Sequence, residues 1–186
     1  DENEWKEILL SNPQLVTFPL SGVTAPFVLD QNSLYSAKSH AEEVYVAATL
    51  SKMLLENRLT VVTGGPGSGK TTSIAKRLVS QMTRSSSAVK NVALVAPTGL
   101  AAKRMKFALA NALANPDLDI DVAPQVHQLI AEIPKSTVHK LLRYNPSSRR
   151  PYGRHAGNTV DYELVIVDEV SMMPLSMMAR VLEALD

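Results

Sequence analysis

The chain contains no cysteine, which excludes disulfide bonds and thiolate metal sites and is compatible with a reducing compartment. Its four histidines lack the spacing of metal ligands, so we expect no structural metal. No apolar run approaches the roughly 20 residues of a membrane-spanning helix, and the acidic start at Asp1, Glu2 and Glu4 does not resemble a secretory signal. Hydrophobic residues nevertheless make up 45% of the 186 positions, which predicts a globular domain with a sizeable core.

The net charge of +1 conceals a segregation of charge along the chain. Residues 1–60 carry a net charge of −4, residues 61–160 a net charge of +10, and residues 161–186 a net charge of −5. A strongly basic middle section is suited to bind a polyanion, of which nucleic acid is the obvious candidate. Lysines and arginines on solvated helices would give the same count, so charge alone leaves both interpretations open.

A glycine-rich stretch fits the phosphate-loop template G-x-x-x-x-G-K-[ST]. It comprises Gly64, Gly65, Pro66, Gly67, Ser68, Gly69, Lys70, Thr71 and Thr72. It follows the apolar run at residues 59–63, a predicted strand, and precedes a predicted helix from Lys70 to about Met82. Such glycines let backbone N–H groups surround phosphate oxygens at the positive end of a helix. Lys70 would contact the β- and γ-phosphates and Thr71 would bind Mg²⁺, which predicts a nucleoside triphosphate site.

Two further apolar runs predict buried strands of the parallel-sheet kind. Residues 91–96 lead into Pro97, Thr98 and Gly99, with a predicted helix close behind. Residues 163–167 lead into Asp168 and Glu169, with a final predicted helix after Pro174. The alternation of strands and helices predicts an α/β fold with a parallel sheet flanked by helices, with ligands at the carboxyl ends of the strands.

Asp168 and Glu169 match the Walker B arrangement, in which a carboxylate at the end of an apolar strand holds Mg²⁺. Glu169 is suited to act as the general base that polarises the attacking water. Adjacent acidic residues often lie in loops as solvated charge, but their position downstream of a phosphate loop favours the catalytic interpretation.

The turn around Thr98 has two interpretations. Thr98 and the N–H groups of the following helix would hold a phosphate of a nucleic-acid backbone, with Lys103 and Arg104 one turn further on. An ordinary strand-to-helix turn capped by threonine explains the same residues.

The first third of the chain shows no catalytic motif. Residues 26–29 and 33–35 predict a hairpin, and Ser39 is the expected cap of a following helix, with Glu42 at the capping-box position. That helix carries the apolar stripe Val44, Ala47, Ala48, Leu54 and Leu55. We expect this region to serve packing or partner contact.

Residues 115–162 form a less regular insertion with expected helices at 124–132 and 137–143. Its loop at residues 146–157 is basic, with Arg149, Arg150, Arg154 and His155. An insertion this long between strands is usually functional or mobile.

Four segments follow one another in the order of known helicase motifs: residues 64–72, 96–104, 136–142 and 167–172. They resemble motifs I, Ia, Ic and II of the superfamily 1 helicases that move 5′ to 3′, and most closely the RecD family, the alpha subunits of exodeoxyribonuclease V. The resemblance covers residues 60–186 well and is looser before them. One departure is that Leu100 stands where that family usually has lysine, whereas Lys103 stands where alanine is usual.

The resemblance implies a RecA-like motor domain that uses ATP and Mg²⁺. It implies that Lys70 and Thr71 bind the triphosphate and Mg²⁺, that Asp168 binds Mg²⁺, and that Glu169 activates water. The single-stranded DNA contacts that it implies are Pro97, Thr98, Gly99, Lys103, Arg104, Thr137 and His139. For His139 a helix-capping or core role remains the alternative.

The resemblance also implies a heterotrimer with RecB- and RecC-like subunits in the bacterial cytoplasm, acting in double-strand break repair. We expect residues 1–58 to form an N-terminal partner or packing region and residues 59–186 the first part of the motor domain. Motifs III to VI, the arginine fingers and one intervening core strand have no counterpart here, so we expect a fragment that hydrolyses little ATP and whose open sheet invites dimerisation. Alternatives are a non-catalytic assembly module or another P-loop DNA-dependent ATPase, whereas the motifs disfavour a small-molecule kinase.

Overall fold

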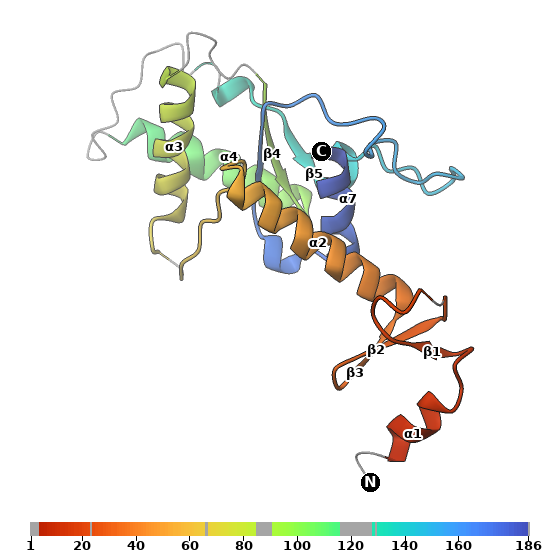
Figure 1. The fold of residues 1–186 in the computed structure, drawn as a ribbon. Helices are drawn as coiled ribbons and strands as arrows, with labels where there is room; N and C mark the ends of the chain where they lie inside the picture. Colours follow the sequence, from red (N-terminus) through yellow and green to blue (C-terminus); the bar gives the residue numbers. More distant parts are fainter. Residues whose placement is uncertain are drawn as a thin grey trace. The chain divides into compact units, whose positions relative to one another are not determined.

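The computed structural model describes residues 4–22, 24–65, 67–84, 91–115, 128 and 130–185. The chain divides into two compact units, Asp1–Arg58 and Leu59–Asp186 (Figure 1). No helix among the described residues is long and apolar enough to cross a membrane.

The first unit contains a small sheet and two helices. Its elements are α1 (Glu4–Leu10), β1 (Val16–Thr17), β2 (Phe27–Asp30), β3 (Ser33–Ser36) and α2 (Ala37–Leu55). β2 and β3 form the predicted antiparallel hairpin, whose turn places Gln31 at a left-handed φ of 51°. β1 adds to the free side of β2 as a parallel strand. A hairpin with a third strand buries more apolar surface than two strands alone.

Helix α2 differs from the prediction in its cap and in its buried face. Its cap is Ser36 and not Ser39, because the Ser36 hydroxyl accepts a hydrogen bond from the Ser39 N–H at 3.1 Å. Val46 is its buried residue, whereas Val44, Leu54 and Leu55 of the predicted stripe are 54%, 52% and 85% exposed. The small sheet lies at the N-terminal end of α2 in Figure 1, so the later turns lack a packing surface within their own unit.

The second unit confirms the predicted α/β class. Its elements are α3 (Lys70–Arg84), β4 (Val92–Ala96), α4 (Gly99–Ala114), β5 (Lys135–Thr137), α6 (Val138–Leu141), β6 (Leu164–Val167), the 3₁₀ helix η2 (Val170–Met172) and α7 (Leu175–Leu185). The sheet has the order β5-β4-β6, and both pairings are parallel. Of the predicted helix at 124–132, only residues 128 and 130–132 are described, and they are helical.

β4 is the centre of the unit because all five of its residues are buried. Its side chains alternate between the two faces of the sheet. Val92 and Leu94 belong to a cluster with α3 and α4, while Ala93 and Val95 belong to a second cluster with α6 and α7. The first cluster contains Ala75, Leu78, Val79, Met105, Leu109, Leu113, Ile130 and Ile133. Helices therefore cover both faces of the sheet.

The strand predicted at residues 59–63 is absent, which corrects the sequence analysis. This segment belongs to no strand, and Val61 and Val62 are 65% and 37% exposed. A strand forms only when a neighbouring backbone completes its hydrogen bonds. Both sides of β4 are already occupied, and β6 pairs with β4 alone among the described strands. β6 is half-buried for the same reason, although the sequence predicted a buried strand.

Truncation of Leu109 tests whether the α3–α4 cluster is the core of the second unit. Leu109 is fully buried, so Leu109→Ala is expected to reduce the free energy of unfolding by about 2–5 kcal/mol. Phe107→Ala on the same helix is the matched control: its ring is 69% exposed, so the change stays within about 0.5 kcal/mol. Urea unfolding measures both. Equal effects of the two substitutions would contradict this packing.

Candidate functional site

The three parallel strands end at one edge of the sheet, and the motif residues follow these ends. The register pairs Ala96 with Thr137 and Val95 with Val167. The Asp168 N–H donates to the Val95 carbonyl at 2.9 Å, which extends the ladder by one hydrogen bond. Figure 1 shows α3 beginning at the end of the unit at which β4 and β6 finish. The candidate nucleotide and nucleic-acid residues therefore lie at the same end of the unit.

The phosphate loop curls around the ammonium group of Lys70. Lys70 Nζ donates to the carbonyl of Gly64 at 2.5 Å and to that of Gly65 at 2.7 Å. Gly64, Gly67 and Gly69 have φ values of 155°, 74° and 78°, a region that favours glycine. A Cβ on Gly64 would also approach the Ser68 side chain, which would have to shift to make room. Pro66, also predicted to bind ATP, lies outside the described residues.

Helix α3 presents its N-terminus to this loop and is held by the core. Ala75, Leu78 and Val79 are buried against β4 and α4. The first turn of α3 contains Thr71 and Thr72, both half-buried, and carries no acidic residue. The positive end of the helix dipole is therefore not neutralised by a side chain of that turn. A glycine loop, an ammonium group and a helix N-terminus together fit a polyphosphate.

The chain turns sharply where β6 ends. Glu169 has a left-handed φ of 52° and precedes the first residue of η2. Its N–H donates to Asp168 Oδ1 at 2.9 Å. A non-glycine residue held in this conformation costs on the order of 1–3 kcal/mol, and such residues cluster at functional sites. The turn keeps both carboxylates, which are half-buried, at the edge of the sheet.

No basic side chain among the described residues forms an ion pair with either carboxylate. Among the described residues, no hydrogen bond or ion pair connects Asp168 or Glu169 with Lys70 or Thr71. A half-buried carboxylate pair without a cation is suited to a hard metal ion, and a threonine hydroxyl and a carboxylate are ligands that Mg²⁺ accepts. The donor set of Thr71 and Asp168 thus fits Mg²⁺, which would link the two halves of the site.

The two candidate DNA-binding threonines both cap helices. Thr98 Oγ1 accepts from the Ala101 N–H at 3.2 Å at the start of α4, and Thr137 Oγ1 accepts from the Lys140 N–H at 3.2 Å at the start of α6. A Cβ on Gly99 would lie 3.9 Å from Thr137 Cγ2, so these two turns adjoin each other. The capping interpretation of Thr98 therefore holds in the structure, and the two capped turns are neighbours at the edge of the sheet.

The remaining predicted DNA contacts differ in exposure. Lys103 and Arg104 on α4 and His139 on α6 are exposed, whereas Pro97 is half-buried. The His139 ring contacts Tyr144 edge-on, with ring centroids 5.1 Å apart. His139 is therefore a surface residue and not a core histidine.

Lys106, which was not among the predicted site residues, connects α4 with the segment before β5. Lys106 Nζ donates to the carbonyls of Ala131 at 2.5 Å and Ile133 at 2.7 Å. Burial lowers the pKa of Lys106, and the nearby charge of Lys135 lowers it further. Within the sequence Lys106 is one cation among several in the basic middle section, so no local signal distinguishes it.

Comparison with known proteins agrees with this geometry. The family model described as AAA domain matches residues 47–186. The chain belongs to the AAA domain family. The chain is 37% identical over 138 residues to the RecBCD enzyme subunit RecD of Mycolicibacterium smegmatis. It is 36% identical over 134 residues to the RecBCD enzyme subunit RecD of Haemophilus influenzae. It is also 34% identical over 137 residues to the ATP-dependent RecD2 DNA helicase of Deinococcus radiodurans.

The aligned regions cover 72%, 70% and 74% of this chain, respectively, but only 24%, 20% and 15% of the relatives. The chain thus spans less than a quarter of the length of these curated relatives. The resemblance to the RecD family, predicted from the motif order, is confirmed by these comparisons.

The capping role of Thr98 is directly testable. Thr98→Ala removes the acceptor for the Ala101 N–H and is expected to lower the free energy of unfolding by about 1 kcal/mol, whereas Thr98→Ser keeps the cap and most of the stability. Chemical denaturation of the two variants measures the difference. Identical stabilities would show that the cap contributes nothing.

Proposed function

We propose that this chain forms the ATP-binding part of a 5′→3′ DNA helicase subunit that acts with RecB- and RecC-like partners in double-strand break repair. One observation carries the proposal: the phosphate loop precedes a helix that begins at the end of the unit where Asp168 and Glu169 leave the sheet. The names of the relatives, RecBCD subunit RecD and RecD2 DNA helicase, support it.

The residues of the loop and of the sheet edge have distinct tasks. Lys70 and the loop N–H groups bind the triphosphate, and Thr71 and Asp168 hold Mg²⁺. Glu169 accepts a proton from the attacking water. Hydrolysis of the phosphoanhydride between the β- and γ-phosphates of ATP supplies the free energy that movement along DNA requires.

Single-stranded DNA would run along the same edge. The N–H groups of the Thr98 and Thr137 turns would contact its phosphates, with Lys103, Arg104 and His139 exposed nearby. β4 leads into the turn at Thr98, and its Val95 carbonyl accepts the hydrogen bond from Asp168. A movement of Asp168 on nucleotide binding would therefore reach the DNA-binding turn through this one strand.

A non-catalytic assembly role is the second candidate. It is favoured by the first unit, which exposes Ile8, Phe18 and Leu20 at 60%, 52% and 105%. Exposed apolar side chains of this kind are suited to partner contact. In this alternative the nucleotide site would be structural.

Lys70→Gln distinguishes the two candidates. Loss of the ammonium group is expected to lower ATP hydrolysis by about 10²–10³-fold, as removal of one transition-state donor does, and to abolish ATP-driven unwinding. Complex assembly, followed by co-purification of the partner subunits, is expected to persist. Lys76→Gln is the matched control, because Lys76 is exposed on the same helix. Normal unwinding by the Lys70→Gln protein would support the assembly role instead.

Glu169→Gln separates binding from chemistry. The amide keeps the shape of the side chain but cannot accept the proton, so hydrolysis is expected to fall by about 10²–10⁴-fold while ATP binding persists. Steady-state ATPase assays and nucleotide titrations measure the two effects. Glu163→Gln, an exposed carboxylate just before β6, is the control. A Glu169→Gln protein with wild-type turnover would remove Glu169 from the mechanism.

A further inference from the structure

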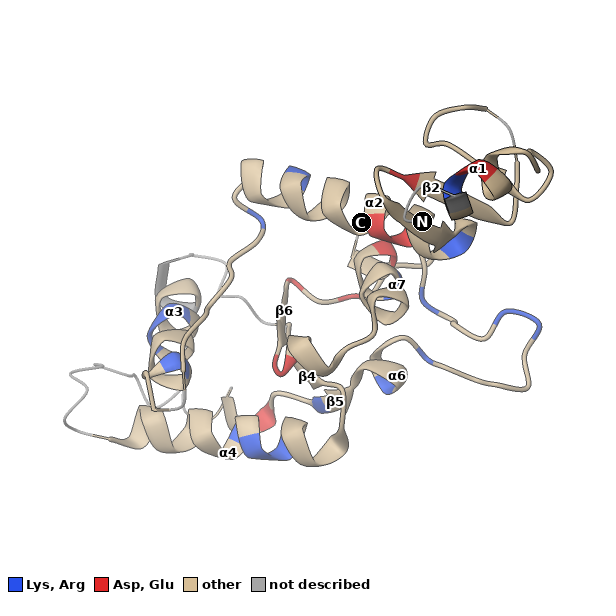
Figure 2. Ribbon diagram, turned by 90° about the horizontal axis from the view of Figure 1, so that it is seen from below, with Lys and Arg blue, Asp and Glu red and all other residues tan. Residues whose placement is uncertain are grey.

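The loop that connects α6 with β6 is basic over most of its length. Residues 143–160 contain four arginines, Arg143, Arg149, Arg150 and Arg154, and neither aspartate nor glutamate. Figure 2 shows its basic positions along the extended loop that follows α6. Uniform positive charge on one segment favours an anionic ligand.

This loop is held by its own hydrogen bonds. Tyr144 and Tyr152 form an antiparallel bridge, and the Asn145 N–H donates to the Pro151 carbonyl at 2.7 Å. The Gly153 N–H donates to the Leu142 carbonyl at 3.0 Å, which attaches the loop to the end of α6. A Cβ on Gly153 would lie 3.1 Å from Arg143 Cβ, so the two sides of the loop are in close contact.

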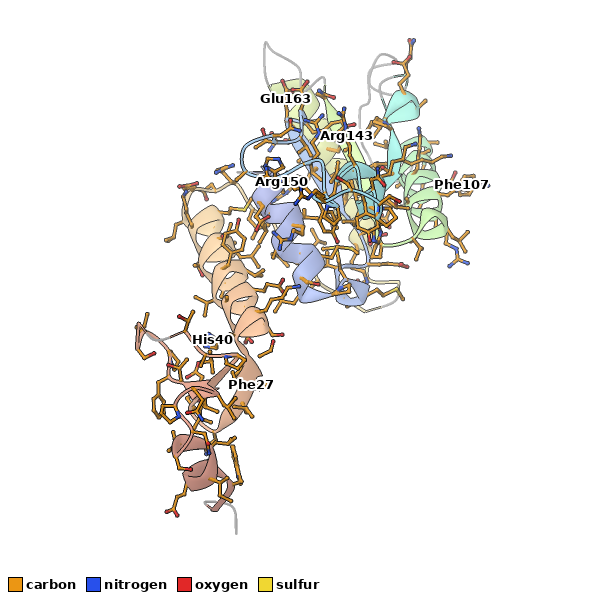
Figure 3. All side chains as sticks on the ribbon, turned by 90° about the vertical axis from the view of Figure 1, so that its right-hand side faces the viewer. Phe27, His40, Phe107, Arg143, Arg150 and Glu163 are labelled. Atoms are coloured by element: carbon orange, nitrogen blue, oxygen red, sulfur yellow. The ribbon has the colours of Figure 1, made fainter. Side chains whose placement is uncertain are left out.

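One of the four arginines forms hydrogen bonds within the loop, and the other three are exposed to solvent. Arg154 Nη1 donates to Asn158 Oδ1 at 3.1 Å and to the Thr159 carbonyl at 2.6 Å. Arg143, Arg149 and Arg150 are exposed, and among the described residues no carboxylate pairs with them. Figure 3 labels Arg143 and Arg150 in this part of the unit.

Three aromatic rings from the same part of the chain lie close to one another. Tyr152 packs against the core cluster that contains Leu141 and Leu142. The Tyr144 ring lies 5.0 Å from the Tyr152 ring, tilted by 45°, and 5.1 Å from the His139 ring at 70°. Tyr144 is nevertheless 40% exposed. Its ring is thus oriented by a half-buried neighbour while part of its surface faces solvent.

We propose that Tyr144 is a stacking platform for a base of single-stranded nucleic acid and that Arg143, Arg149 and Arg150 bind the flanking phosphates. This inference rests on the proposed function. It extends the proposed DNA-binding surface from His139 to the residues of this loop. Aromatic side chains beside unpaired cations bind single strands, because each base offers a π-face and each nucleotide a phosphate. Bases within a duplex are already stacked, which favours the single strand. An acidic protein would engage the arginines but has no requirement for the ring.

Fluorescence anisotropy with a labelled oligothymidine of about 20 nucleotides tests the platform in the full-length protein. Tyr144→Ala is expected to weaken binding by about 5- to 140-fold, the range for loss of one stacked base, whereas Tyr144→Phe keeps the ring and the affinity. An abasic strand of the same length is the decisive ligand: Tyr144→Ala should leave its affinity unchanged. An equal loss for both strands, or no loss for either, overturns the stacking role.

The arginines are tested by salt dependence. Removal of two phosphate contacts in Arg149→Gln/Arg150→Gln is expected to reduce the slope of log affinity against log salt by about 1.4. Lys38→Gln is the control, because its side chain is 77% exposed on α2 of the other unit. An unchanged slope overturns the phosphate contacts. Wild-type protein that binds no oligothymidine refutes the proposed function itself, whereas strong binding with unaffected variants refutes only this inference.

Discussion

The parallel pairing of β4 with both of its neighbours is the constraint on which the rest of the second unit depends. Because Ala96 pairs with Thr137 and Val95 with Val167, the three strands end together. The turns that follow them therefore reach the same edge of the sheet without any contact between their side chains being required. Packing on both faces of β4 holds this register, because a slip by one residue would remove Val92 and Leu94 from one core cluster and Ala93 and Val95 from the other.

The candidate functional residues are consequently placed by backbone geometry, and no network of side chains connects them among the described residues. Thr98 and Thr137 cap helices that begin directly after strands, so their hydroxyls serve stability while the neighbouring N–H groups remain at the edge. Asp168 is positioned by the hydrogen bond from its N–H to Val95, and Glu169 by a left-handed turn. A structural role and a binding role are thus compatible at the same residues.

Much of the fold could be predicted because its signals are local. The apolar run of β4, the glycines of the phosphate loop and the hairpin turn near Gln31 each follow from neighbouring residues. Where the prediction failed, the deciding partner lies elsewhere. Residues 59–63 have the composition of a strand but pair with none of the described strands, and Leu54 and Leu55 have helical spacing but remain 52% and 85% exposed. Ser36 and Ser39 are both capable caps, and the end of β3 at Ser36 selects between them.

The candidate site was predictable to the extent that it consists of motifs. Lys70, Asp168 and Glu169 belong to short patterns whose chemistry requires those residue types. Lys106 and the pair of Tyr144 and Tyr152 acquire their roles only through tertiary contacts, with carbonyls 25 and 27 residues away in one case and across a loop bridge in the other. No spacing within the sequence reveals such contacts.

The central claim is that nucleotide and DNA occupy one edge of the same sheet and are therefore coupled. ATP hydrolysis by the full-length protein, measured with and without single-stranded DNA, tests it most directly. The account predicts that the single strand accelerates hydrolysis and that a non-hydrolysable ATP analogue alters the affinity for the strand, because binding couplings are reciprocal. The claim would be contradicted if single-stranded DNA left the rate of ATP hydrolysis unchanged and the ATP analogue left the DNA affinity unchanged.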